Sequence, residues 1–373
     1  MKATVLSDSL VQGLGIVGQV TMRNGNFPAD SVLVQSDGRR LKLSACDLEM
    51  GLHHWLGARV EDDGAICVLA QTLHDLVKVV GSGSEIHLAS STKGKLGVQA
   101  GRTKASIKET GDPEDFPNLA QAVDAIRVEV QAADLRTAIS QVAFAAATKE
   151  IRPILTGVLA EFEGSTLSLV AADGYRLSAR TLAQPVADPF SVVIPARALA
   201  VLGRIGKQEQ DPITVIVTHN RIAFRLTDTT LVSQLIGGKF PDYQQIIPQE
   251  WTTRTTVATA EFRQACKTAH IFARESGYVL LHANDGSFGV SATGLTGGYR
   301  CSMQADVEGD EIEIGFDNRW LLDVLAVIEA DQVELRTTTK ADAGVLRPVG
   351  DADYTHVLMP LVTEYAQITG RKQ

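Results

Sequence analysis

The sequence predicts an α+β fold of three repeated domains, each made of two halves that combine one helix with several strands. Three families of segments carry this prediction, because each recurs along the chain with one common spacing of about 125 residues. Any single match could arise by chance, whereas three families that share one period indicate internal repetition. The shared register predicts domains at residues 1–124, 125–251 and 252–373.

The first family consists of strands in which apolar and polar residues alternate, each ending in small residues and a turn. Its copies are residues 41–50, 167–177 and 288–295. The second family reads as a short strand that runs into an amphipathic helix, at residues 67–77, 193–202 and 314–325. The third family opens each domain with a helical pattern, at residues 6–20, 132–147 and 259–274.

Each domain of this kind has unpaired strands at its edges, and such edges associate unless they are paired. Three similar domains in a row can pair their edges head to tail, which curves the array. If the rotation closes, the product is a ring with sheets outside and helices inside. The repeats leave open whether one chain or two would complete it, and three duplicated domains without a common task remain the alternative.

Composition describes an ordinary globular protein, with 45% hydrophobic and 21% charged residues. The 35 basic and 44 acidic residues give a net charge of −9, which excludes a protein that coats nucleic acid through a generally basic surface. The four cysteines lie far apart, so we expect reduced thiols in a cytoplasmic protein. We find no signal-peptide pattern and no apolar run that could cross a membrane.

Basic residues nevertheless collect on the predicted helices. In the third domain Arg263, Lys267, His270 and Arg274 form one stripe beside an apolar stripe. On any single helix a solvated polar face is the more common explanation, but a ring lined by such helices would hold duplex DNA through its phosphates without reading sequence. The candidate DNA-binding residues are Arg23, Lys78, Arg136, Lys149, Arg152, Arg197, Arg204, Lys207, Arg263, Lys267 and Arg274.

Four motifs, at residues 170–177, 238–244, 314–322 and 357–361, resemble the bacterial DNA polymerase III beta subunit, the replicative sliding clamp. The resemblance extends over essentially the whole chain in the family's order and spacing. It implies a closed ring of three DNA-clamp domains per subunit, formed by a head-to-tail homodimer around double-stranded DNA. It also implies tethering of replicative polymerase, clamp loader and repair proteins through a linear peptide motif.

By position, the resemblance places the partner-peptide pocket between the second and third domains. Its residues would be Leu155, Ala172, Gly174, Tyr175, Arg176, Leu177, Pro241, Ile246, Val345, Val357, Leu358, Met359, Pro360 and Leu361. An apolar cleft that contains a flexible methionine suits several related peptides. Ala172 departs from the family's usual threonine, and Gln244 and Gln245 replace its usual basic pair. We hypothesise that the extra tail at residues 362–373 lies near this pocket.

For ring closure, the resemblance predicts that Ile271 and Phe272 of one subunit contact Ala105 and Ile107 of the other. Ala105 is small where a large aromatic residue is common in the family. We therefore expect a weaker dimer interface than is typical.

The chain offers little for catalysis. Gly13, Gly15 and Gly18 match a dinucleotide-binding fingerprint, but they fall inside a helical pattern instead of opening one. His53 and His54 point to opposite faces of a strand, so neither suggests a metal site. Asp47 and Asp173 recur at turns, where they are expected to cap backbone groups. We predict a protein that is not an enzyme and has no cofactor or metal; a repeat scaffold that binds only proteins is the alternative.

Overall fold

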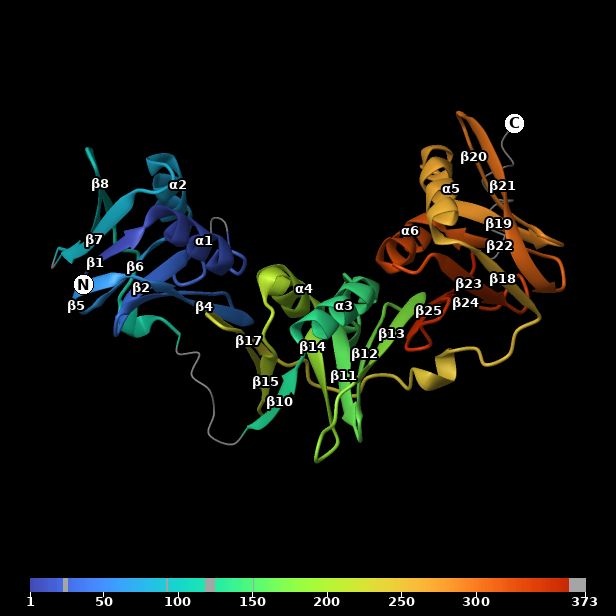
Figure 1. The fold of residues 1–373 in the computed structure, drawn as a ribbon, viewed down its shortest axis with the longest axis horizontal. Coiled ribbons are helices and arrows are strands. Elements are labelled where there is room, and N and C mark those ends of the chain that lie inside the picture. Colours follow the sequence, from blue (N-terminus) through green and yellow to red (C-terminus); the bar gives the residue numbers. More distant parts are fainter. Residues whose placement is uncertain (23–25, 92, 118–124, 150, 362–373) are drawn as a thin grey trace. The chain divides into compact units, whose positions relative to one another are not determined.

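The structure, a computed structural model, describes residues 1–22, 26–91, 93–117, 125–149 and 151–361. The chain divides into two compact units. Figure 1 labels many of their helices and strands. Unit 1 contains residues 1–136 and 197–235, and unit 2 contains residues 137–196 and 236–373. The predicted central domain therefore contributes strands to both units.

Unit 1 contains a five-stranded sheet in the order β5-β1-β7-β8-β9. All its neighbours are antiparallel, and β9 forms one edge. In β7 and β8, Ile86, Leu88, Leu96 and Val98 are buried and alternate with more exposed residues, as expected of half-buried strands. The strands are β1 (Lys2–Leu6), β5 (Arg59–Asp62), β7 (Glu85–Ser91), β8 (Lys95–Ala100) and β9 (Thr103–Lys108).

Unit 1 also contains an eight-stranded sheet in the order β10-β15-β16-β17-β4-β3-β2-β6. At its centre β17 pairs with β4, which joins strands of the first predicted domain to strands of the second. The first four are β10 (Ile126–Val130), β15 (Ile213–Val217), β16 (Arg221–Arg225) and β17 (Thr229–Gln234). The other four are β4 (Met50–Gly57), β3 (Arg40–Cys46), β2 (Ser31–Asp37) and β6 (Ala65–Leu69).

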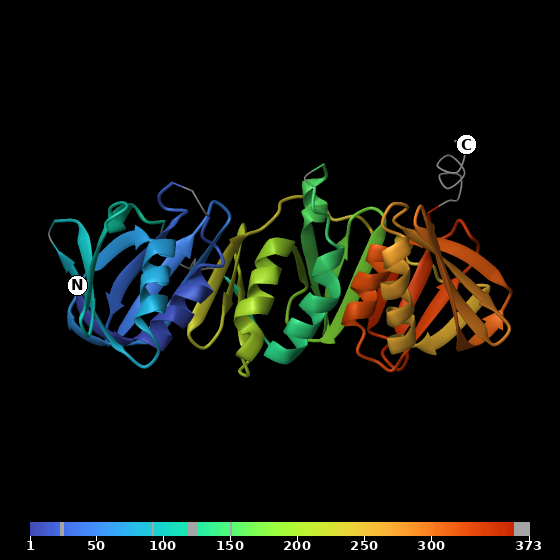
Figure 2. The same ribbon diagram turned by 90° about the horizontal axis from the view of Figure 1, so that it is seen from above.

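Helices α1 (Ser7–Val17) and α2 (Ala70–Val80) of unit 1 pack against each other, and Figure 2 shows them side by side. α1 lies against β3 and β4, where Gly13 approaches Leu43, His54 and Leu56 so closely that a larger side chain would force them to shift. Leu10, Leu14, Leu73 and Val77 complete this buried contact. α4 (Ala196–Ile205) belongs almost entirely to the same unit.

Unit 2 contains a twelve-stranded sheet in the order β14-β11-β12-β13-β25-β24-β23-β18-β21-β20-β19-β22. Here β13 pairs with β25, joining the second predicted domain to the third. The strands of its first part are β11 (Gly157–Glu163), β12 (Thr166–Ala172), β13 (Arg176–Ala183) and β14 (Phe190–Pro195). Those of its second part are β18 (Thr253–Ala258), β19 (Tyr278–Asn284), β20 (Ser287–Gly294), β21 (Gly297–Gly309), β22 (Ile312–Asp317), β23 (Gln332–Thr337), β24 (Gly344–Pro348) and β25 (Tyr354–Leu358).

The long strand β21 turns this sheet back on itself. Residues 297–304 pair with β20, and residues 305–309 pair with β18. Helices α5 (Thr259–Phe272) and α6 (Asn318–Val327) lie side by side over the enclosed core (Figure 2). Phe262 packs edge-on against Phe288 at 5.0 Å between ring centroids, with Phe316 and Leu321 fully buried nearby.

Within the described residues a strand leads into a helix six times, as the repeats predict. The predicted apolar faces are confirmed, because Leu135, Ile139 and Val142 of α3 (Ala132–Val142) are buried. The opening helices end earlier than predicted, however: α1 ends at Val17, α3 gives way to a 3₁₀ turn, and α5 ends at Phe272. The last basic position of the α5 stripe, Arg274, therefore lies beyond the helix.

Candidate functional site

An apolar cluster in unit 2 contains five of the predicted pocket residues. Leu155, Ala172, Leu177, Val345 and Val357 are buried together, with Phe240 among their neighbours. The pairing of β13 with β25 creates the cluster, since Leu177 lies directly opposite Val357, and Val357 lies opposite Val345 on β24. Residues far apart in sequence thus form one apolar floor across the junction of the second and third predicted domains.

Exposed apolar side chains accompany this floor. Tyr175 is 62% exposed, Ile246 46%, Met359 40% and Leu361 38%. Pro241 is also exposed, whereas Pro360 is buried. Leu358 instead lies in the core beneath α5 and α6, because successive residues of a strand face opposite sides of the sheet.

A tight turn between β12 and β13 presents Tyr175. Asp173 Oδ1 accepts hydrogen bonds from the backbone N–H groups of Tyr175 (2.9 Å) and Arg176 (3.0 Å). Gly174 sits at φ +95°, a conformation that favours glycine. The Tyr175 carbonyl then accepts a bond from the Met359 N–H at 2.8 Å, which holds these two exposed side chains on neighbouring segments.

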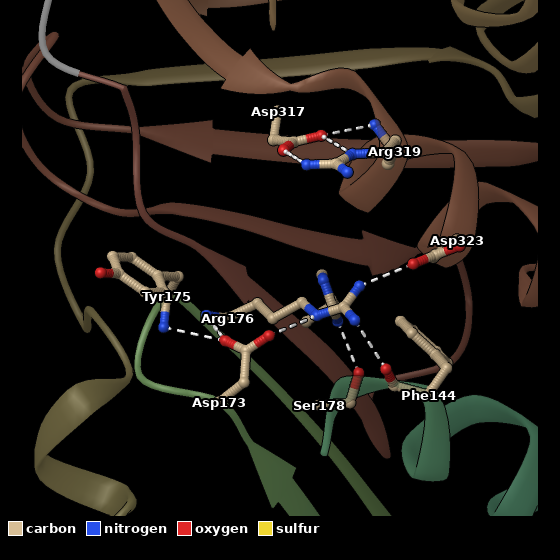
Figure 3. Close-up of polar contacts among 9 residues, drawn as sticks. Phe144, Asp173, Tyr175, Arg176, Ser178, Asp317, Arg319 and Asp323 are labelled. Carbon is tan, nitrogen blue, oxygen red and sulfur yellow. Dashed lines mark hydrogen bonds and ion pairs between the residues drawn. The ribbon is translucent and has the colours of Figure 1, made fainter. Parts of the chain in front are cut away.

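Arg176 is largely occupied by contacts within unit 2 (Figure 3). Its Nε donates to Asp173 Oδ2 (3.0 Å), Nη1 to Asp323 Oδ2 (2.7 Å) and Nη2 to the Phe144 carbonyl (2.7 Å). The side chain is only 10% exposed. Arg176 therefore organises the turn and its surroundings, and offers little of its own surface to a ligand.

Sequence reasoning missed the residues that receive these contacts. Trp320 of α6 stacks on Tyr175 at 5.7 Å between ring centroids, and the Arg176 guanidinium lies over the rings of both Phe144 and Trp320. Trp320 belongs to one of the family motifs, but its pattern indicated only a helix. Periodicity could not show that this helix reaches the turn of another domain.

A buried histidine lies directly beneath Arg176. His356 Nδ1 is 2.5 Å from Ser178 Oγ, and its ring stacks on Phe144 at 5.5 Å. Burial, reinforced by the positive charge of Arg176, lowers the pKa of His356 to about 3. His356 is therefore a neutral core residue at physiological pH.

The predicted DNA-binding residues fall into two groups. Six are exposed and make no ion pair or side-chain hydrogen bond within the described residues: Lys78, Lys149, Arg152, Lys207, Lys267 and Arg274. The other four described residues have partners. Arg136 donates to the Gly206 carbonyl (3.0 Å), Arg263 to the Ile328 carbonyl (3.0 Å) and Arg204 to the Gln19 side chain (2.8 Å), while Arg197 forms an ion pair with Asp47 (2.6 Å). Arg23 lies outside the described residues, as does the predicted tail at 362–373.

Arg136 and Arg263 occupy equivalent positions in the repeat, and both are half-buried. Each donates to a carbonyl group just beyond the C-terminal end of the next helix, after α4 and after α6 respectively. Such carbonyl groups lack partners within their own helix. These two arginines consequently connect helix pairs, a structural role that their basic character did not reveal.

The capping aspartates and the glycine motif lie where the sequence predicts them. Asp47 Oδ1 accepts bonds from the N–H groups of Glu49 and Met50, both at 2.8 Å, so Asp47 caps its turn as Asp173 does. Gly13 and Gly15 lie within α1, and Gly18 follows its last residue, so the three glycines cannot open a helix toward a dinucleotide.

His53 and His54 of β4 have separate partners, Ser44 Oγ (2.8 Å) and Thr229 Oγ1 (2.9 Å). Burial, with a smaller contribution from Lys42, lowers the pKa of His53 to about 4. Across the part of the chain that the structure describes, no three histidine, cysteine or acidic side chains cluster as metal ligands would. No described helix is long and apolar enough to span a membrane.

The predicted dimer residues lie on an edge strand in unit 1 and at the end of a helix in unit 2. Ala105 and Ile107 are on the edge strand β9 of unit 1, the first half-buried and the second buried. In unit 2, Ile271 is 55% exposed at the end of α5, and Phe272 stacks on Tyr299 of β21 at 6.2 Å between ring centroids. In the described part of the chain, β9 is an edge strand, and residues 297–304 of β21 pair with β20 on one side only.

Comparison with known proteins gives one consistent result. Residues 1–120, 129–242 and 244–362 match the N-terminal, central and C-terminal domains of the DNA polymerase III beta subunit, in that order. The beta sliding clamp of Caulobacter vibrioides is 29% identical over 372 residues, covering 97% of this chain and 100% of that protein.

Solved structures agree with this result. The DNA polymerase sliding clamp of Bacillus subtilis superimposes with a TM-score of 0.92 at 25% identity, covering 97% of this chain and 99% of the other. A sliding clamp of Pseudomonas aeruginosa, solved with bound griselimycin, gives a TM-score of 0.91 at 27% identity, with the same coverage of 97% and 99%.

Proposed function

Because the chain belongs to the bacterial DNA polymerase III beta subunit family, the DNA sliding clamps of replication, we propose that two copies close head to tail into a ring around duplex DNA. The ring would confer processivity topologically, since a tethered polymerase rebinds before it diffuses away. Its function is mechanical and requires no catalytic residue. As a replication protein it would act in the cytoplasm.

One observation supports the ring above all others. The two junctions between predicted domains within the chain pair equivalent strands of the repeat, and they pair them in the same register. At the first junction β4 pairs with β17, with Met50 opposite Ser233. At the second, β13 pairs with β25, with Arg176 opposite Leu358. Met50 and Arg176 each come three residues after the capping aspartate of the preceding turn. The two junctions therefore have the same strand pairing and the same register.

The same rule predicts a third junction. The repeat makes β21 the equivalent of β4 and β13, and β9 the equivalent of β17 and β25. Among the residues that the structure describes, both have a side without a strand partner, since β9 is an edge strand and residues 297–304 of β21 pair with β20 alone. We infer that β21 of one copy pairs with β9 of the other, with Gly297 opposite Ile107 and Tyr299 opposite Ala105. Ala105 and Ile107 are residues that the family resemblance also placed at the interface, and Phe272, its predicted partner there, stacks on Tyr299.

A single substitution tests this register. The proposed register places Thr103 of one copy opposite Cys301 of the other, at a separation that a disulfide can bridge. The other three cysteines are buried, and burial raises the pKa of Cys46 to about 11 and of Cys67 to about 12, so they should resist oxidation. Thr103→Cys should therefore form a covalent dimer when oxidised.

The matched control is Lys104→Cys, which faces the opposite side of the sheet and should cross-link far less. Oxidising the Thr103→Cys protein on a nicked circular plasmid should produce rings that stay on the circle in high salt. Those rings should be released when the plasmid is cut. Release that does not depend on cutting would favour the alternative, a scaffold that binds only proteins.

We further propose that linear peptides of polymerase, clamp loader and repair proteins dock on the apolar floor of unit 2. The floor is buried, while Tyr175, Ile246 and Met359 provide exposed apolar surface beside it. Methionine is flexible enough to adapt to related sequences. Peptides of this kind bind grooves through a few apolar anchors, which matches this arrangement.

DNA contact in the ring is proposed for the six exposed basic residues that have no ion pair or side-chain hydrogen bond to another described residue: Lys78, Lys149, Arg152, Lys207, Lys267 and Arg274. Their charges are available to phosphates, whereas Arg136 and Arg263 already bind carbonyl groups. Phosphate contacts of this kind are independent of sequence and weaken as salt rises.

A further inference from the structure

The strand register proposed for the ring has a consequence for its stability. It places Lys104 on β9 of one copy directly opposite Arg300 on β21 of the other. Both side chains are exposed, and neither makes an ion pair within the described residues. We propose that this like-charge pair weakens the ring-closing junction, so that the ring closes more tightly as ionic strength rises.

The two junctions within the chain show how unusual this pair is. At the position equivalent to Lys104 and Arg300, the first junction has Thr230 opposite His53, and the second has Thr355 opposite Ala179. His53 is uncharged at neutral pH, since its pKa is lowered to about 4. The equivalent internal pairs therefore carry no charge, whereas the closing junction carries two positive charges.

Neither residue has a charged side chain directly opposite it within its own sheet. Within each sheet the neighbour of Lys104 is Gln99, and the neighbour of Arg300 is Ser291, neither of which is charged. Arg102, exposed in the turn before β9, adds a further positive charge near the junction. Like charges directly opposite each other on adjacent strands are destabilising, and each ring would contain this arrangement twice.

The apolar side of the same junction offers little compensation. The register places Tyr299 opposite Ala105, whose single methyl group buries little area. Gly297, which has no side chain, lies opposite Ile107. Charge on one face and small residues on the other thus act in the same direction, toward a weaker junction.

The inference rests on the proposed ring, and charge reversal tests both. Dimer affinity is measured by sedimentation velocity of a fluorescently labelled chain at low and at moderate salt. Lys104→Glu should tighten the dimer about tenfold at low salt, since repulsion becomes attraction at both junctions. Arg300→Glu should do the same, and the double variant Lys104→Glu/Arg300→Glu should return to the weak affinity of the parent.

Lys340→Glu, in the exposed loop between β23 and β24, is the matched control. It makes the same charge change away from both strands. The chain is already negative, so general repulsion between copies predicts that Lys104→Glu and Lys340→Glu both weaken the dimer equally. That result would overturn the like-charge pair while leaving the ring intact. A parent and variants that stay monomeric at all concentrations would overturn the ring itself.

Discussion

Replacing Arg176 by methionine tests whether this residue is structural or contacts the partner peptide. The substitution removes three donated hydrogen bonds, to Asp173, Asp323 and the Phe144 carbonyl. A hydrogen bond to a charged group contributes roughly 1.5–3 kcal/mol. Water can reach Asp323, which is 46% exposed, and Asp173 keeps its two backbone donors, so part of the loss is recovered.

We therefore expect Arg176→Met to lower the free energy of unfolding of unit 2 by about 2–4 kcal/mol. Trp320, which stacks beside Arg176, reports this transition by its fluorescence during urea unfolding, once Trp55 and Trp251 are replaced by phenylalanine. Asp323→Asn removes a charge but keeps a hydrogen-bond acceptor, so it should lower the free energy of unfolding by only about 1 kcal/mol. Unchanged stability together with loss of peptide binding would refute the structural role and make Arg176 a direct contact.

Three further predictions follow from the same geometry. The pKa of His356 is about 3 in the folded chain, below its ordinary value of 6.5, so the unfolded chain takes up the proton first and stability is lost as pH falls from 6.5 toward 3. Between pH 7 and pH 5 the free energy of unfolding of unit 2 should fall by about 2 kcal/mol. In urea titrations at each pH, the His356→Gln variant should show a smaller fall over the same range. Lys267→Ala should reduce the salt dependence of DNA binding, by about one to two in the log–log slope for a ring with two copies, whereas Arg263→Ala should leave the slope unchanged and lower thermal stability. Met359→Ala should weaken a fluorescently labelled clamp-binding peptide about tenfold in anisotropy titrations, and an equal loss with Leu295→Ala, far from the apolar floor, would exclude a specific contact.

Much of the fold follows from local pattern. The strand-to-helix transitions at residues 65–80 and 312–327 were predictable, because period-two alternation gives way to helical spacing within a few residues. The capping roles of Asp47 and Asp173 were predictable for the same reason, since a short acidic side chain in a turn binds N–H groups two and three positions ahead. Helix ends were harder to predict from the sequence: the helical pattern continued to Arg274, whereas α5 ends at Phe272.

The candidate sites were predictable only in part. Family motifs located Leu177 and Val357, but their pairing across 180 positions depends on strand partners that no local pattern specifies. Arg136 and Arg263 looked like free charges because sequence gives no information about carbonyl groups at the end of another helix. Trp320 looked like one more residue of an amphipathic helix until the fold brought it onto Tyr175.

The sequence by itself determined the threefold repeat, the order of strands and helices in each copy, and the family, because these depend on periodicity and motifs along one chain. Only the tertiary structure decided which basic side chains remain free, which are bound, and which strands have an open side. Those properties depend on distances between residues far apart in sequence. The register shared by the β4–β17 and β13–β25 junctions is the clearest case, since it emerges only when strands of different repeats are paired.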